Sequence, residues 1–204
     1  FVADPHYKRY IVITLAVVGV AALAVLVIVN AAKGGASQAG GFRGTRILAW
    51  LNPEEYSDNT GFQTLQALYA IGSGGLWGKG LGQSMQKLGF LPEAQNDMVF
   101  SIICEELGLF GAFCVILLFV MLLWRMMVIA NNAPDLFGAL LVVGVMGHFA
   151  IQVVLNIAVV TNSIPNTGIT LPFISYGGTS ILFLMSEVGL VLNVSKSIRL
   201  RDVG

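Results

Sequence analysis

Charged residues are scarce in this sequence. Asp, Glu, Lys and Arg together make up 11% of its 204 residues, whereas soluble globular domains have about 25%. Hydrophobic residues make up 56% and the mean hydropathy is +0.80, so the composition is that of an integral membrane protein. The net charge is zero, and no basic surface indicates a nucleic-acid partner.

Cysteines are also few. Cys104 and Cys114 lie ten residues apart in one apolar segment, a spacing that fits neither a zinc cluster nor a CxxC redox pair. We therefore interpret both as small packing residues. Lys8 and Arg9 precede the first apolar segment, but no small-residue cleavage site follows Val29, so no signal peptide is predicted. Because the first residue is not Met, we expect the chain to be a fragment of a larger polytopic protein.

Four apolar segments approach the length of about 20 residues that a helix needs to cross a membrane. They cover about residues 10–29, 98–124, 136–160 and 179–194, the last being the shortest. The sequence therefore predicts an all-α fold, a polytopic transmembrane helix bundle with a large extracellular loop at about 30–97 between the first two spans. Within that loop, a short amphipathic helix is predicted at 64–71.

Basic residues in the short flanks predict the orientation. With four spans they fall on one side of the membrane: Lys8, Arg9, Arg125, Lys196, Arg199 and Arg201. Short basic flanks remain in the cytoplasm, so both termini are predicted to be cytoplasmic. The loop 30–97, including its end at Asp97, is then extracytoplasmic, as is the connection 161–178, which has neither Lys nor Arg.

The segment 91–108 has four acids at the point where the loop becomes strongly apolar: Glu93, Asp97, Glu105 and Glu106. Carboxylates are costly in hydrocarbon, and such groups indicate a functional site. The structural alternatives remain open. Asp97 would cap the helix N-terminus, and Glu105 and Glu106 would pair with Lys or Arg from another span.

One face of this predicted helix carries small residues. At about 100° per residue, one face is shared by Asp97, Ser101, Cys104, Gly108 and Gly111. Small residues allow another helix to approach closely. The face is therefore predicted to be buried, with Asp97 at its outer end.

The third and fourth predicted spans also contain polar residues. His148, Gln152 and Asn156 lie on one face at intervals of four residues, where they either line a cavity or form hydrogen bonds between helices. Glu187 in the fourth span would pair with His148 or with a residue elsewhere. The proline-containing segment 163–178 is too apolar for a solvated loop, so it is either re-entrant, close to a site, or a packed connector.

The glycine-rich stretch 72–82 does not match a nucleotide-binding motif. A P-loop would need Gly at position 73 and Ser or Thr at position 80, which are Ser73 and Gly80 here. Exposed backbone N–H groups beside Lys79 would still suit a phosphate group.

These features together resemble the SEDS family, the FtsW/RodA/SpoVE group of cell-wall proteins. Four stretches carry the resemblance: GFQTLQALYAIGSGGLWGKGLG (61–82), LPEAQNDMVFSIICEELG (91–108), QVVLN (152–156) and IPNTGITLPFISYGGTS (164–180). It runs from about Arg43 to Arg201, and TGITLPFISYGG resembles the FtsW and SpoVE branches more than RodA. Family members have about ten spans, so the chain resembles the last four.

The resemblance implies a peptidoglycan glycosyltransferase in the bacterial plasma membrane, active in division or sporulation. Such proteins polymerise lipid II, a disaccharide-pentapeptide on undecaprenyl pyrophosphate, at the outer membrane face. It also implies a class B penicillin-binding protein as partner. The family's essential Asp corresponds to Asp97, although Gln95 and Asn96 stand where many relatives have His-Thr.

A single carboxylate suits this chemistry, with Asp97 as the general base that takes the acceptor hydroxyl proton. Lys79 is predicted near the pyrophosphate leaving group, with Glu105 as its support, and a divalent cation, Mg or Mn, is a further source of positive charge. Glu106, Gln66 and Ser175 complete the candidate substrate-binding residues.

Two other functions compete with this one. A lipid II flippase would use the polar face of the third span and the proline-broken segment as its path. A scaffold that mainly recruits a transpeptidase would need no carboxylate chemistry at all.

Overall fold

The computed structural model describes residues 49–55, 60–89, 91–92 and 94–198. These residues form helices and no strand: α3 (Thr60–Gly74), the short 3-10 helix η1 (Gln86–Leu88), α4 (Val99–Asn131), α5 (Leu136–Val160) and α6 (Gly178–Ser197). The predicted all-α fold is confirmed for this part of the chain. The predicted first span, 10–29, lies outside the described residues.

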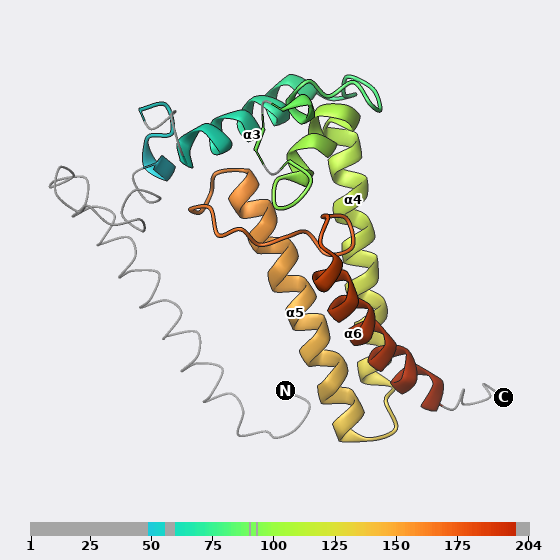
Figure 1. Cartoon of the computed structure of the whole chain (residues 1–204). Coiled ribbons are helices and arrows are strands. Elements are labelled where there is room, and N and C mark those ends of the chain that lie inside the picture. The colour runs from blue at the N-terminus through green and yellow to red at the C-terminus, as the bar shows by residue number, and fades with distance from the viewer. Residues whose placement is uncertain (1–48, 56–59, 90, 93, 199–204) are drawn as a thin grey trace, which may run out of the picture.

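Three of the described helices, α4, α5 and α6, are long and apolar enough to cross a membrane. Figure 1 shows them side by side, with α3 lying across the end at which the chain enters α4. α5 matches the predicted 136–160, whereas α4 continues past the predicted end at 124. The helix predicted at 64–71 lies within the longer α3.

α4 is interrupted at Gly108, whose φ of 68° and ψ of −168° are not helical. Glycine adopts a positive φ without the steric cost that a side chain would impose. The part that follows, 109–131, would extend about 35 Å at roughly 1.5 Å per residue, which matches a hydrocarbon core of about 30 Å. The membrane crossing is therefore assigned to 109–131, and 99–107 forms a separate helical segment before it.

The glycine-rich segment 75–80 replaces the helical hydrogen bonds that the break removes. In a continuous helix, the carbonyls of Glu105 and Glu106 would accept from the N–H groups four residues later. Here the N–H of Lys79 donates to the Glu105 carbonyl and the N–H of Gly80 to the Glu106 carbonyl, both at 2.9 Å. The two carbonyls at the break are thus satisfied by the loop.

The N–H groups on the other side of the break are satisfied by the same segment. Leu109 N–H donates to the Gly75 carbonyl at 2.9 Å, and Phe110 N–H donates to the Leu76 carbonyl at 3.3 Å. Unpaired backbone groups are costly in a membrane. The break at Gly108 and the glycine-rich segment therefore form one structural unit.

The described hydrophobic core consists of two clusters. One joins α3, the start and middle of α4, and the upper part of α5 through buried residues that include Ala67, Met98, Phe100, Val153 and Leu171. The other lies further along the bundle and joins α4, α5 and α6 through Met126, Ala130, Val142, Phe149, Leu184 and Val191. Large apolar side chains remain exposed on the outer faces of α4 and α6, as expected for surfaces in lipid or against other spans.

Gly74→Ala is expected to destabilise the protein, whereas Gly72→Ala is expected to be tolerated. A Cβ at Gly74 would lie 1.9 Å from the Cys104 carbonyl oxygen, but a Cβ at Gly72 meets no heavy atom within 4 Å. Since the obstacle is backbone, we expect a loss of about 3 kcal/mol for Gly74→Ala. Thermal unfolding of the full-length protein in detergent measures the difference, and equal midpoints for the two variants would contradict the close approach of α3 and α4.

Candidate active site

Asp97 lies immediately before α4 and is 8% exposed. The N-cap position of α4 is Met98, so the structural alternative that placed Asp97 at the cap is wrong by one residue. The helix begins later than the sequence pattern suggested, and Asp97 belongs to the turn that leads into it. Glu93 lies outside the described residues.

Gln63 of α3 connects Asp97 to two other segments. Its Nε2 donates to Asp97 Oδ1 and to the Pro92 carbonyl, each at 3.3 Å. Its Oε1 accepts from Asn166 Nδ2 at 3.0 Å. Sequence reasoning selected Gln66 instead, which lies half-buried one turn further along α3. Two glutamines three residues apart gave no sign of which one faces Asp97.

Asn156 of α5 holds the backbone at Asp97 in place. This side chain is fully buried, and its Nδ2 donates to the Asp97 carbonyl at 2.8 Å and to the Ile169 carbonyl at 2.7 Å. Buried amides of this kind fix the relative position of the segments that they connect. Asn156 therefore joins α5, the start of α4 and the segment 163–178.

The rest of the polar face of α5 also forms bonds between segments. Gln152 Nε2 donates to the Thr170 carbonyl at 3.0 Å, and His148 Nδ1 lies 2.9 Å from Glu187 Oε2 on α6. Of the two sequence-based alternatives for this face, hydrogen bonding between segments is the one that the contacts show. The pairing of His148 with Glu187 is also confirmed.

The segment 163–178 runs back along α5, and α6 begins beside the middle of that helix (Figure 1). Phe173 stacks on Phe149 of α5 with ring centroids 5.4 Å apart, and its φ of 62° is unusual for a residue with a side chain. Buried Ser175 accepts a hydrogen bond from Leu171 N–H at 2.7 Å. Tyr176 N–H donates to the Gln95 carbonyl at 2.8 Å, which ties the segment to the turn containing Asp97.

Glu105 and Glu106 form a second cluster with basic residues of the glycine-rich loop. Glu105 is fully buried and lies 2.7 Å from Lys79 Nζ, and it also accepts a hydrogen bond from Ser84 Oγ. Glu106 pairs with Lys87 and is 13% exposed. The expected ion pairs are therefore present, but their basic partners come from the loop before α4 and not from another span.

The structure separates these two clusters. Asp97 and Glu105 are eight residues apart, which corresponds to about 12 Å along a helix. Asp97 contacts α3, α5 and the segment 163–178, whereas Glu105 contacts Lys79 and Ser84. The sequence-predicted site residues are thus not all in one contact network.

The described residues do not offer a divalent cation a set of protein ligands. They include no group of three or more His, Cys, Asp or Glu side chains arranged to hold a metal ion. Gln63 and Asn156, which bond to Asp97, are neutral amides, and Glu105 and Glu106 have lysine partners. The donor set thus does not fit a resident metal site.

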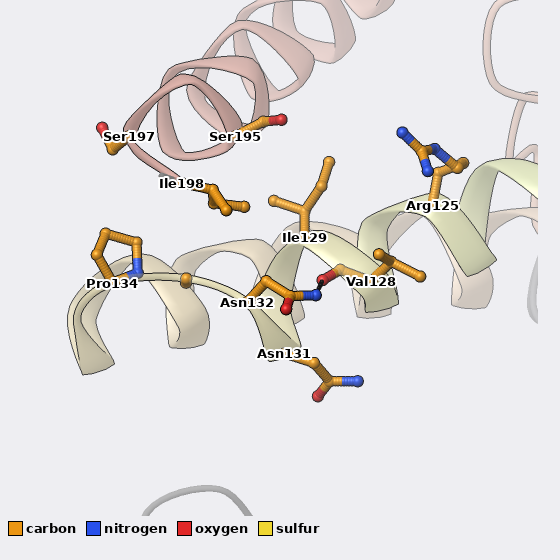
Figure 2. A pocket seen from close by; sticks show the side chains of 10 residues that line it. Arg125, Val128, Ile129, Asn131, Asn132, Pro134, Ser195, Ser197 and Ile198 are labelled. Carbon is orange, nitrogen blue, oxygen red and sulfur yellow. Dashed lines mark hydrogen bonds between the residues drawn. The ribbon is translucent and has the colours of Figure 1, made fainter. Parts of the chain in front are cut away.

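A large cavity lies far from Asp97, between the ends of α4 and α6 (Figure 2). Its volume is about 1050 Å³, and residues such as Arg125, Asn131, Pro134 and Ser195 line it. These residues lie at the α4–α5 connection, at the opposite end of α4 from Asp97. The cavity therefore does not belong to the candidate active site.

Comparison with known proteins identifies a family. A model of the cell cycle protein family FTSW_RODA_SPOVE matches residues 2–200. Stage V sporulation protein E of Bacillus subtilis (strain 168) is 54% identical over 155 residues, which cover 76% of this chain and 42% of that protein. The probable peptidoglycan glycosyltransferase FtsW of Trichlorobacter lovleyi is 46% identical over 159 residues, which cover 78% of this chain and 42% of that protein. The chain thus spans less than half the length of these relatives.

Two solved structures are also similar. A chain from the study "Structural coordination of polymerization and crosslinking by a peptidoglycan synthase complex" matches with a TM-score of 0.66 and 29% identity, covering 93% of this chain and 51% of that chain. The crystal structure of an Asp-to-Ala mutant of the rod shape determining protein RodA from Thermus thermophilus has a TM-score of 0.51 and 36% identity. It covers 66% of this chain and 40% of that chain.

Lys79→Met is expected to destabilise the protein more than Lys87→Met. Lys79 neutralises the fully buried Glu105, whereas the partner of Lys87 is 13% exposed. Leaving a buried charge unpaired costs about 3 kcal/mol, and breaking a pair that water reaches costs about 1 kcal/mol or less. Thermal unfolding midpoints of the full-length variants provide the comparison.

The double variant Lys79→Met/Glu105→Gln provides the control. Because it removes both charges, its unfolding midpoint is expected to recover toward that of the wild type. A double variant as unstable as Lys79→Met would show that the ion pair is not the cause of the loss.

Proposed function

This chain belongs to the FtsW/RodA/SpoVE family of cell cycle proteins, and we propose that it is part of a peptidoglycan glycosyltransferase that polymerises lipid II in division or sporulation. The names of its FtsW and sporulation relatives support this function. The observation that carries the proposal is the placement of Asp97. Its carboxylate is buried at the end of a membrane helix and is held by residues of α3 and α5.

The proposed reaction joins two glycan units. The 4-hydroxyl oxygen of the acceptor sugar forms a bond to the anomeric carbon of the donor, and the bond from that carbon to the undecaprenyl pyrophosphate breaks. Asp97 accepts the hydroxyl proton, and the pyrophosphate leaves with the bonding electrons. An α-linked donor gives a β-1,4 product by a single inversion, so no second carboxylate is needed as a nucleophile.

The contacts of Asp97 suit a general base. Asn156 fixes the backbone at this residue, and Gln63 donates to the carboxylate itself. A carboxylate held in one orientation avoids part of the entropic cost of aligning it with the acceptor hydroxyl. Burial also limits the water that would compete for its lone pairs.

Lys79 is proposed to supply positive charge near the pyrophosphate. Its side chain is about one-third exposed, at 35%, while its Nζ is bound to Glu105, so Glu105 would position it. Glu106, Gln66 and Ser175 remain proposed substrate-binding residues. No step of this mechanism uses a divalent cation, because the described side chains offer no suitable ligand set.

The reaction is proposed to occur at the outer face of the bacterial plasma membrane, with a class B penicillin-binding protein as partner. The structural similarity to a chain of a peptidoglycan synthase complex supports such a partner. Arg125 lies at the opposite end of the bundle from Asp97, and basic flanks favour the cytoplasm. The Asp97 end would therefore face outward and both termini inward.

A lipid II flippase is the rival function. Its path would use the polar face of α5, but Gln152 and Asn156 donate hydrogen bonds that fix the segment 163–178 against that helix. Side chains that hold a folded segment suit a fixed site better than a moving path.

Asp97→Asn in the full-length protein with its transpeptidase partner is expected to lower lipid II polymerisation at least about 10²-fold, because the amide cannot accept the proton. Gel analysis of the glycan chains measures the product. Glu54→Gln, which changes an exposed carboxylate, is the matched control and should polymerise normally. Normal chains from Asp97→Asn would refute the general-base role.

Single cysteines test the proposed orientation. In a variant whose native cysteines are replaced by serine, exposed Gln83→Cys should react with a membrane-impermeant maleimide on intact cells, whereas exposed Asn131→Cys should react only after lysis. The reason is that the two positions lie at opposite ends of α4. The reverse labelling pattern would invert the orientation.

A further inference from the structure

The hydrogen bonds between Asn166 and Asp97 have a defined donor and acceptor order. Gly168 N–H donates to Asn166 Oδ1 at 2.9 Å. A backbone N–H can only donate, so the oxygen of the Asn166 amide must face Gly168. Its Nδ2 is then the atom that lies 3.0 Å from Gln63 Oε1.

The other end of the chain of bonds requires the same order. The Pro92 carbonyl can only accept, and Gln63 Nε2 lies 3.3 Å from it. Both neighbours therefore orient the Gln63 amide in one way, with its oxygen toward Asn166 and its nitrogen toward Asp97. That nitrogen donates to Asp97 Oδ1 at 3.3 Å.

We propose that Gln63 and Asn166 are positioning residues for the carboxylate of Asp97, and that they make its orientation depend on the segment 163–178. This inference rests on the proposed role of Asp97 as general base. Asn166 does not need to touch the substrate to act in this way. It fixes the amide of Gln63, and that amide presents an N–H group to the carboxylate.

The substitution Asn166→Asp tests the order of donors and acceptors directly. An aspartate can still accept from Gly168 N–H, so the local turn is retained. Its second oxygen faces Gln63 where a donor was present, and the Gln63 amide must rotate to donate to it. The rotated amide presents its oxygen to the Asp97 carboxylate and to the Pro92 carbonyl, both of which are acceptors.

Asn166→Ala provides the matched comparison. It removes the bond from Gly168 as well as the bond to Gln63, so it perturbs the segment more than Asn166→Asp does. The Pro92 carbonyl still orients Gln63 correctly in this variant. A purely structural role for Asn166 therefore predicts the greater loss of activity in Asn166→Ala, and the positioning role predicts the greater loss in Asn166→Asp.

The experiment measures kcat and KM for lipid II polymerisation by the full-length protein with its transpeptidase partner. We expect Asn166→Asp to lower kcat about tenfold with little change in KM, because a hydrogen bond to a charged group is lost. Asn166→Ala should lower kcat less. The opposite order of the two variants, or an equal loss in both, would overturn the proposal.

Gln63→Leu gives a second test that does not depend on the folding of the Asn166 variants. It removes the amide, so kcat should fall about tenfold, and adding Asn166→Asp should then lower kcat no further. Independent, multiplicative losses would overturn the proposed coupling.

Asp97→Asn separates failure of this inference from failure of the proposed function. If Asp97→Asn is inactive while Gln63→Leu has the wild-type kcat, only the positioning role is wrong. If Asp97→Asn polymerises normally, the base assignment fails and the positioning role fails with it.

Discussion

The break in α4 at Gly108 depends on a simple constraint, which is that backbone N–H and C=O groups in a membrane need hydrogen-bond partners. The segment 75–80 supplies four such bonds, two to carbonyls before the break and two from N–H groups after it. This arrangement lets 99–107 lie apart from the membrane-crossing part of α4 without unpaired groups. It also buries Glu105 against the loop, where Lys79 neutralises it. The orientation of the helical segment that begins just after Asp97 thus depends on glycine-rich backbone far from the candidate base.

α5 organises the other side of the site. Its polar face holds α6 through His148 and the segment 163–178 through Gln152 and Asn156. Asn156 also holds the Asp97 backbone. Polar side chains in a membrane helix are costly unless they are paired, and here the pairing builds the site. Asp97 is consequently fixed by residues from three directions, of which only α5 is a membrane-spanning helix.

Several features could be predicted from the sequence because they are local. Long apolar runs gave the ranges of α5 and, approximately, of α4 and α6, and the spacing of four placed the polar residues of α5 on one face. The start of α4 was less predictable, since Met98 and not Asp97 occupies the N-cap position. The break at Gly108 was also missed, because a glycine within an apolar run ordinarily continues a helix. Its partner segment lies about thirty residues earlier in the chain, and periodicity carries no information at that range.

The sequence by itself determined that the chain is a membrane protein, which segments are apolar enough to span, and that the acids at 97, 105 and 106 need an explanation. Composition and local pattern suffice for these conclusions, because hydrocarbon excludes charge wherever it occurs. Only the tertiary structure decided which partners those acids have. It placed Glu105 and Glu106 against lysines of the loop, and Asp97 against Gln63 of α3, with Asn166 behind it. Hydrogen bonds have a fixed length and direction, so partners distant in sequence are selected by how the helices pack.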